Sequence, residues 1–97
     1  MRFTRKIDLF KHVRETRPHH CEVCFSRIHE AKTWCFAHIV DISWSKKHKF
    51  NPNNIALVCS IWCHNSVDVI CKWQRQILLD ILEKWEKPDL LELQAKN

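Results

Sequence analysis

Two closely spaced pairs of cysteines are the residues of this sequence best suited to bind a metal ion. Two residues separate Cys21 from Cys24, and three separate Cys59 from Cys63. A structural zinc ion needs four ligands in a tetrahedron, and cysteine pairs from two separate turns supply them. The wider second pair also converges, because positions i and i+4 at the start of a helix lie on one side of it. The sequence therefore predicts a structural zinc site made of these four thiolates.

Neighbouring histidines leave the ligand set open. His19, His20 and His64 lie next to the cysteine pairs, and each could replace one thiolate. The alternative to a metal site is a set of buried free thiols. Cys35 and Cys71 have no close partner along the sequence, so core packing is their expected role.

A second set of polar residues begins between the two cysteine pairs. His38 lies within an apolar segment, and Asn54 directly precedes the apolar run 55–58. His64 and Asp68 are four residues apart in a segment with a helical pattern, so both side chains face one side at ligand spacing. Each residue also has an ordinary structural role available: a strand histidine bonded to a carbonyl, a turn asparagine, a helix cap and an exposed helix charge.

The order of these residues, Cys-Cys, His, Asn, Cys-Cys-His, resembles the HNH endonucleases, a family within the ββα-metal nuclease group. The resemblance covers about residues 21–68. It implies a small, zinc-stabilised, phage-like enzyme that hydrolyses DNA phosphodiester bonds, by nicking or by double-strand cleavage. The first alternative is a non-catalytic, zinc-stabilised module that binds nucleic acid. The second is a structural or protein-interaction domain built on the C-terminal helix.

The resemblance assigns a chemical role to each polar residue. It makes His38 the general base that deprotonates water, and Asn54 the catalytic-site residue that fixes the loop and orients the base. It makes His64 and Asp68 ligands of one divalent ion, distinct from the zinc, that stabilises the leaving oxygen. Mg²⁺, Mn²⁺, Co²⁺ and Ni²⁺ are the candidates for this ion, given an imidazole and a carboxylate as ligands.

The chain departs from the family at Ala37. Many members have His or Asp immediately before the base, whereas an alanine cannot bind a metal ion. Asp41 is on the same strand face as Ala37, but about 13 Å away along an extended strand. Asp41 is therefore too far to replace the missing ligand unless the strand bends.

Basic residues indicate a polyanionic partner. The sequence has 16 Lys and Arg residues against 11 Asp and Glu residues, a net charge of +5. The candidates for DNA contacts are Arg5, Lys6, Arg14, Lys46, Lys47 and Lys49. Contacts of this kind neutralise phosphates and release counterions, and they position the protein without specifying a sequence. A merely solvated basic surface is the alternative.

The sequence also bears on location. Its uncharged runs are too short to span a membrane, and residues 1–6 lack the apolar core of a secretory signal. We therefore expect no membrane partner and an intracellular, cytoplasmic protein, in the host cytoplasm if a phage encodes it. Six cysteines in a reducing compartment favour metal binding over disulfides.

Length and local patterns predict one α+β domain, residues 1–97. The resemblance implies a small zinc-stabilised ββα-metal domain, treble-clef-like, with an N-terminal helix and a long C-terminal helix. Local patterns predict a helix at 4–16 capped by Thr4, strands at 33–42 and 55–58 that pair as a hairpin, a surface loop at 43–53, and a helix over about 63–87.

An apolar stripe follows the predicted C-terminal helix. Its members are Val67, Ile70, Ile77, Leu78, Ile81, Leu82 and Trp85. The stripe is expected to pack against helix 4–16 as part of the core. A homodimer seam is the alternative, although Gln74 interrupts the stripe and two heptads are few.

The sequence contains no glycine. Turn positions with left-handed backbone conformation must then be filled by other residues, and asparagine adopts this conformation most readily. The expected positions are Asn51, Asn53, Asn54 and Asn65.

Overall fold

A two-stranded antiparallel hairpin lies at the centre of the computed structural model, which describes residues 3–95. Strand β1 (Phe36–His38) pairs with β2 (Ile55–Leu57) in a register that places Ala37 opposite Ala56. The predicted hairpin is therefore confirmed, and the chain has the α+β class expected from its sequence.

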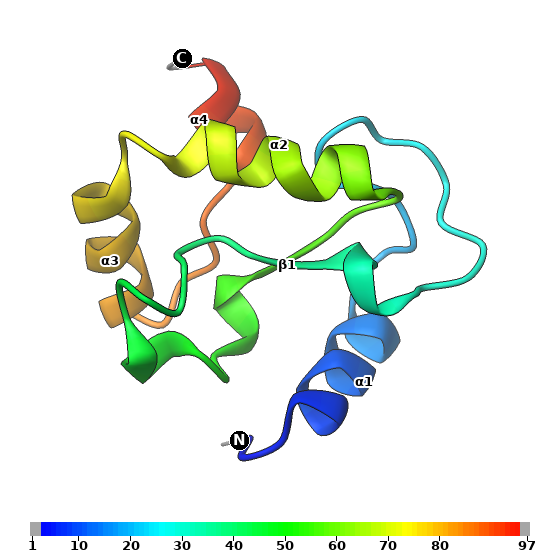
Figure 1. Ribbon diagram of the computed structural model, residues 1–97, viewed down its shortest axis with the longest axis horizontal. Coiled ribbons are helices and arrows are strands. Elements are labelled where there is room, and N and C mark those ends of the chain that lie inside the picture. Colours follow the sequence, from blue (N-terminus) through cyan, green and yellow to red (C-terminus); the bar gives the residue numbers. More distant parts are fainter. Residues whose placement is uncertain (1–2, 96–97) are drawn as a thin grey trace.

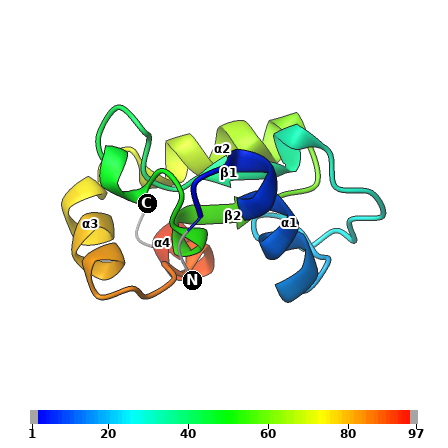
Figure 2. The same cartoon turned by 90° about the horizontal axis from the view of Figure 1, so that it is seen from below.

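Helices surround this hairpin. Within residues 3–95 there are four α-helices: α1 (Lys6–Thr16), α2 (Ile61–Cys71), α3 (Arg75–Glu83) and α4 (Leu90–Ala95). Figure 1 shows α2 on one side of the hairpin and α1 on the other. The view in Figure 2 agrees with it in placing α1 and α3 at opposite ends of the molecule.

Alternation along the strands divides the core into two clusters. Successive strand residues face opposite sides of a sheet. Phe36, Ile55 and Leu57 pack with Leu9 and Val13 of α1. Ala37 and Ala56 face the opposite side of the hairpin and belong to a second cluster with residues of α2, α3 and α4. Its other members include Val58, Val67, Ile70, Leu78, Leu82, Leu90 and Leu93. The buried part of the apolar stripe thus shares its core with α4, and the expectation that the stripe packs against helix 4–16 was wrong. Two predicted members of the stripe, Ile77 and Trp85, are exposed.

The long C-terminal helix is also wrong, because it is two helices. The chain leaves helical geometry between α2 and α3, where Gln74 has φ −120° and ψ 19°. The buried Gln74 amide donates hydrogen bonds to the carbonyls of Ile70 (2.9 Å) and Leu93 (3.3 Å). Its side chain therefore satisfies a carbonyl at the end of α2, which a continuing helix would have satisfied with a backbone N–H.

The other predicted boundaries shift for local reasons. Helix α1 begins at Lys6 after an extended Arg5 that makes no side-chain cap, so Thr4 is not the capping residue. The predicted strand 33–42 is shorter, because Thr33–Cys35 forms a 3₁₀ turn and the chain bends after His38.

The predicted surface loop 43–53 is not wholly a surface loop. It contains the 3₁₀ turn Lys46–His48, and a second turn, Pro52–Asn54, leads into β2. The side chains of His48 and Asn51 are buried, and they hydrogen-bond to each other at 3.1 Å. The loop therefore carries a small polar core of its own.

Left-handed backbone conformation falls at two positions that the sequence did not indicate. Among the described residues, Phe25 (φ 66°) and Trp85 (φ 57°) have positive φ. The four asparagines expected there do not. Phe25 follows the turn that contains Cys21 and Cys24, and its N–H bonds to the carbonyl of Cys21 (2.9 Å). The geometry of this turn therefore overrides the preference of the residue.

Glu22 joins three distant parts of the chain. Its carboxylate accepts hydrogen bonds from Arg17 (3.2 Å), the N–H of Leu57 (2.6 Å) and the ammonium of Lys87 (2.5 Å). This carboxylate therefore ties the end of α1, strand β2 and the segment before α4 to one point.

In the described part of the chain, no helix combines the length and apolarity that crossing a membrane requires.

Candidate metal centre and active-site cleft

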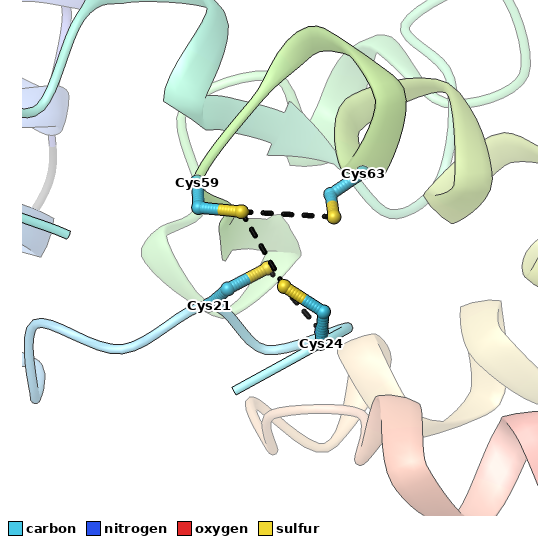
Figure 3. Close-up of side chains that lie close together, drawn as sticks. All are labelled: Cys21, Cys24, Cys59 and Cys63. Atoms are coloured by element: carbon cyan, nitrogen blue, oxygen red, sulfur yellow. Dashed lines mark hydrogen bonds between the residues drawn. The ribbon is translucent and has the colours of Figure 1, made fainter. Parts of the chain in front are cut away.

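The four cysteines predicted to bind zinc lie together. The sulfur atoms of Cys21, Cys24, Cys59 and Cys63 all lie within 4.8 Å of one another, and in Figure 3 they converge from two segments. The Sγ–Sγ distance is 3.4 Å from Cys24 to Cys59 and 3.8 Å from Cys59 to Cys63. A tetrahedron of zinc–sulfur bonds of about 2.3 Å has edges of about 3.8 Å. The donor set and its spacing therefore fit a structural zinc ion.

Each cysteine pair is positioned by local hydrogen bonds. In the first pair, the N–H groups of Val23 and Cys24 point to Cys21 Sγ at 3.4 Å. In the second, Ser60 caps α2 by accepting a hydrogen bond from the N–H of Cys63 at 3.3 Å. Cys63 thus lies in the first turn of α2, and the cap of this helix fixes its backbone.

The thiols differ in acidity. Ser26, whose hydroxyl lies 3.2 Å from Cys24 Sγ, lowers the pKa of Cys24 to about 6. Burial raises the pKa of Cys63 to about 12 and also raises the pKa of Cys59. Four thiolates this close need a positive charge between them, which a divalent ion provides.

The neighbouring histidines do not join this cluster. Within residues 3–95, the four cysteines form the only group of three or more His, Cys, Asp or Glu side chains with ligand atoms in mutual reach. His19 instead hydrogen-bonds the carbonyl of Arg14 at 2.8 Å. Cys35 and Cys71 are buried in separate core clusters, as expected.

The second predicted site is an open cleft of about 600 Å³ between α2 and the chain that follows β1. It is lined by His38, Asp41, Ile42, His64, Asn65, Asp68 and Val69. His38 comes from the end of β1, whereas His64 and Asp68 lie one turn apart on α2. The structure therefore brings together three of the four polar residues that the sequence singled out.

The contact of His38 with Lys49 favours one tautomer of its neutral ring. Its Nε2 lies 3.1 Å from the carbonyl of Lys49, which can only accept, so Nε2 carries the hydrogen. Neutral imidazole then leaves Nδ1 with a free lone pair. Burial lowers the pKa of His38, while the Lys49 carbonyl and Asp41 oppose the shift and Lys6 and His64 add to it.

Asn54 lies beneath the cleft rather than in it. Its buried side chain accepts a hydrogen bond from the N–H of Val40 (2.7 Å) and donates to the carbonyls of Val40 (3.0 Å) and His48 (3.2 Å). These bonds hold the segment that delivers the Lys49 carbonyl to His38. Asn54 therefore has the contacts of a residue that positions the loop, not of one that reaches into the cleft.

Ala37 and Asp41 lie in different surroundings, Ala37 in the core and Asp41 at the cleft. Ala37 is 1% exposed and packs in the cluster with Val67, so no space surrounds its side chain. Asp41 lines the cleft together with His64 and Asp68, because β1 ends at His38 and the chain bends after it. Within residues 3–95, the ligand atoms of these three side chains do not form a group in mutual reach, so a role for Asp41 as the third ligand stays a proposal.

Arg75 was missed from the sequence, where nothing separates it from other surface arginines. The start of α3 brings its guanidinium carbon 4.0 Å from the centroid of the Trp44 ring. Arg75 also contributes to the lowered pKa of Asp41, although the main cause is the hydrogen bond from the N–H of Ser43. It therefore adds positive charge near the cleft.

The predicted DNA-contacting residues differ in how free they are. Arg5 is paired with Asp8 at 3.0 Å, and Lys47 is paired with Glu83 at 2.6 Å. Lys46 and Lys49 are exposed. Lys6 and Arg14 line a separate groove of about 650 Å³ beside α1.

No protein-family model, curated protein or solved structure matches this chain. The cleft and the cysteine cluster are therefore the features from which a function can be inferred.

Proposed function

We propose that this chain is a metal-dependent endonuclease of the HNH type that hydrolyses DNA phosphodiester bonds. The observation that carries the proposal is the cleft that His38, from the end of β1, lines together with His64 and Asp68 of α2, two side chains of types that bind divalent ions. A base and a cation on opposite walls are what in-line hydrolysis requires.

His38 would take a proton from the attacking water. The Lys49 carbonyl fixes the ring through Nε2, so that Nδ1 is the atom that accepts the proton. Asn54 keeps this carbonyl in place through its bonds to Val40 and His48. The lowered pKa of His38, caused mainly by burial, favours the neutral ring that this step needs.

His64, Asp68 and Asp41 would hold the divalent ion. When bound, the ion supplies the positive charge that stabilises the leaving oxygen. One imidazole and two carboxylates suit Mg²⁺, Mn²⁺, Co²⁺ or Ni²⁺ better than they suit a softer ion. Because Asp41 and Asp68 are exposed, several water molecules would remain on the ion.

Positive charge on both sides of the cleft would hold the DNA backbone. The charge of Lys6 contributes to the lowered pKa of His38, so this lysine on α1 is the candidate for a phosphate contact on the β1 side. Lys46 and Lys49 follow on the loop that supplies the carbonyl for His38. Such contacts would give affinity that falls with salt concentration.

A plasmid-nicking assay with added Mg²⁺ or Mn²⁺ tests the proposal. His38→Ala should lower the cutting rate by about 10²-fold or more while leaving DNA affinity nearly unchanged. His29→Ala is the matched control, because His29 is exposed and lies outside the cleft. Cutting by His38→Ala at the parent rate would show that the mechanism is wrong.

Two other results would support the alternatives. DNA retardation without cutting under every ion would identify a non-catalytic zinc module, which the buried Ala37 favours because it removes one family ligand. Neither retardation nor cutting would identify a protein-interaction domain, with a homodimer through the C-terminal helices as its simplest form.

A further inference from the structure

All five tryptophans of this chain are exposed. Their exposed fractions run from 49% for Trp34 to 82% for Trp73. Tryptophan is on average highly buried, because its large apolar ring gains free energy by leaving water. A small domain that leaves every such ring in solvent has rings available for a ligand.

Two of these rings lie near the two ends of α2, the helix that forms one wall of the cleft. Trp62 is in the first turn of α2 and seven residues before Val69, so these two side chains share one face of the helix, whereas Trp73 follows two residues after α2 ends at Cys71. Val69 itself lines the cleft beside Asp68. A strand of nucleic acid lying in the cleft would therefore meet an indole ring on either side of the proposed metal ligands.

A third ring lies beside the other wall. Trp44 follows Asp41 by three residues, and its N–H bonds to the Asp41 carbonyl at 2.9 Å. The Arg75 guanidinium covers one face of Trp44 at 4.0 Å, and the Lys72 ammonium lies 5.3 Å from the Trp73 ring centroid. Each cation brings a phosphate-binding charge next to an aromatic surface.

The composition of this surface favours nucleic acid over a protein partner. Asn65, Asp68 and Lys72 lie along the chain between Trp62 and Trp73, whereas a helix-packing seam needs contiguous apolar positions. The surface combines separate aromatic rings with nearby cations in a chain of net charge +5. Aromatic rings bind bases by stacking on their faces, and those faces are accessible only where bases are unpaired.

We propose that the cleft takes DNA containing unpaired bases, such as a single strand or a single-stranded branch, and that these bases stack on Trp44, Trp62 and Trp73. The inference rests on the proposed function for the reaction at this cleft. It adds a class of substrate, defined by exposed base faces rather than by sequence.

Binding measured by fluorescence anisotropy, on zinc-loaded protein without added divalent ion, tests the inference. The probes are a labelled oligothymidine and a duplex of the same length. Trp62→Ala and Trp73→Ala should each weaken single-strand binding by about fivefold or more, the effect of one lost stacked base, and change duplex binding by less than about twofold. Trp44→Ala should act in the same direction.

Trp85→Ala is the matched control. Trp85 is 60% exposed and lines a different cavity, beside Lys46 and Phe50, so its removal should leave the ratio of the two affinities unchanged. Equal losses on both probes, or no loss in any of the three variants, would overturn the proposal. Dissociation of a dimer by Trp62→Ala or Trp73→Ala, without any effect on DNA, would assign the surface to a second copy and overturn it as well.

Cutting assays separate this inference from the proposed function. If the chain cuts duplex plasmid and the tryptophan variants cut it equally well with no single-strand defect, the nuclease stands and the stacking surface fails. If the chain cuts nothing but loses single-strand affinity in the tryptophan variants, the stacking surface stands and the nuclease fails.

Discussion

The cysteine cluster and the cleft are two candidate metal sites that differ in how closely the structure already places their ligand atoms. In the cluster, four ligand atoms already lie within 4.8 Å of one another, held by a turn and by the start of α2. In the cleft, the candidate ligands are spread around a space of about 600 Å³, and Asp41 and Asp68 are exposed. Preorganisation of this kind separates a structural ion from an exchangeable one.

The two sites also differ in the chemistry of their ligand atoms and in the length of chain that an ion would join. The cluster offers soft sulfur ligands from segments 35 residues apart, so an ion there closes a long loop and becomes part of the fold. The cleft offers imidazole and carboxylate side chains, and an ion held by them would keep water ligands, as the proposed function requires of an exchangeable ion. The two sites should therefore respond very differently to chelators and substitutions.

Removal of the zinc should have the largest effect. A structural zinc ion contributes on the order of 10 kcal/mol to folding, comparable to the whole stability of a small domain. Chelation, Cys21→Ser or Cys59→Ser should therefore unfold the chain, as measured by circular dichroism and zinc content. Cys35→Ala is the control that keeps the zinc. A folded, zinc-free protein in reducing buffer would contradict the comparison.

Substitution of Ala37 should destabilise rather than improve the cleft. Adding the family ligand as Ala37→Asp would bury an unpaired charge in the α2 core at a cost of about 3–5 kcal/mol in the free energy of unfolding. Urea denaturation would measure this loss. Asp41→Asn, which keeps the side-chain oxygen that accepts from the Ser43 N–H, should leave the free energy of unfolding nearly unchanged and raise the metal concentration for half-maximal cutting. A stable Ala37→Asp variant that cuts at lower metal concentration would show that the core has room.

The pH dependence should report on His38. Because burial holds its pKa below the ordinary value of 6.5, the base stays deprotonated and the cutting rate should begin to fall only below pH 6.5. The unfolded chain takes up this proton first as the pH falls, so the free energy of unfolding should also decline there. Rates measured over a pH series in the parent and in His29→Ala should agree. An acid limb above pH 6.5 would refute the assignment.

The smallest expected effect lies beside the zinc. Phe25 is 58% exposed and holds a left-handed conformation, so Phe25→Gly relieves backbone strain with little loss of burial. We expect it to raise the free energy of unfolding of the zinc-loaded protein by up to about 1 kcal/mol. Phe25→Ala, which keeps the strained backbone, should not. Equal values for the two variants would show that the turn is unstrained.

Local sequence patterns were enough to predict the cysteine cluster and the hairpin. The spacing of Cys21 and Cys24 and the alternation in 55–58 sufficed for the cluster and the hairpin. Tertiary contacts decided what the sequence missed: the Gln74 amide divides one predicted helix into two by reaching Leu93, a residue on a helix that the pattern did not reveal.

The cleft shows the same limit. The order of His38, His64 and Asp68 placed three residues at one site, and the structure brings them together. The bend after β1, which brings Asp41 to the cleft, was not predicted because the segment after His38 has the composition of a strand. Arg75 reaches Trp44 through the position of α3, and no local pattern carries that information.

Glu22 has partners that leave the ribosome at very different times. Arg17 precedes it, the N–H of Leu57 follows 35 residues later, and Lys87 follows 65 residues later. The first zinc ligands are likewise synthesised long before Cys63. Contacts this far apart along the chain slow folding, because loop closure must precede them. We therefore expect zinc capture and folding to occur together, in one late step after nearly all of this segment has been translated.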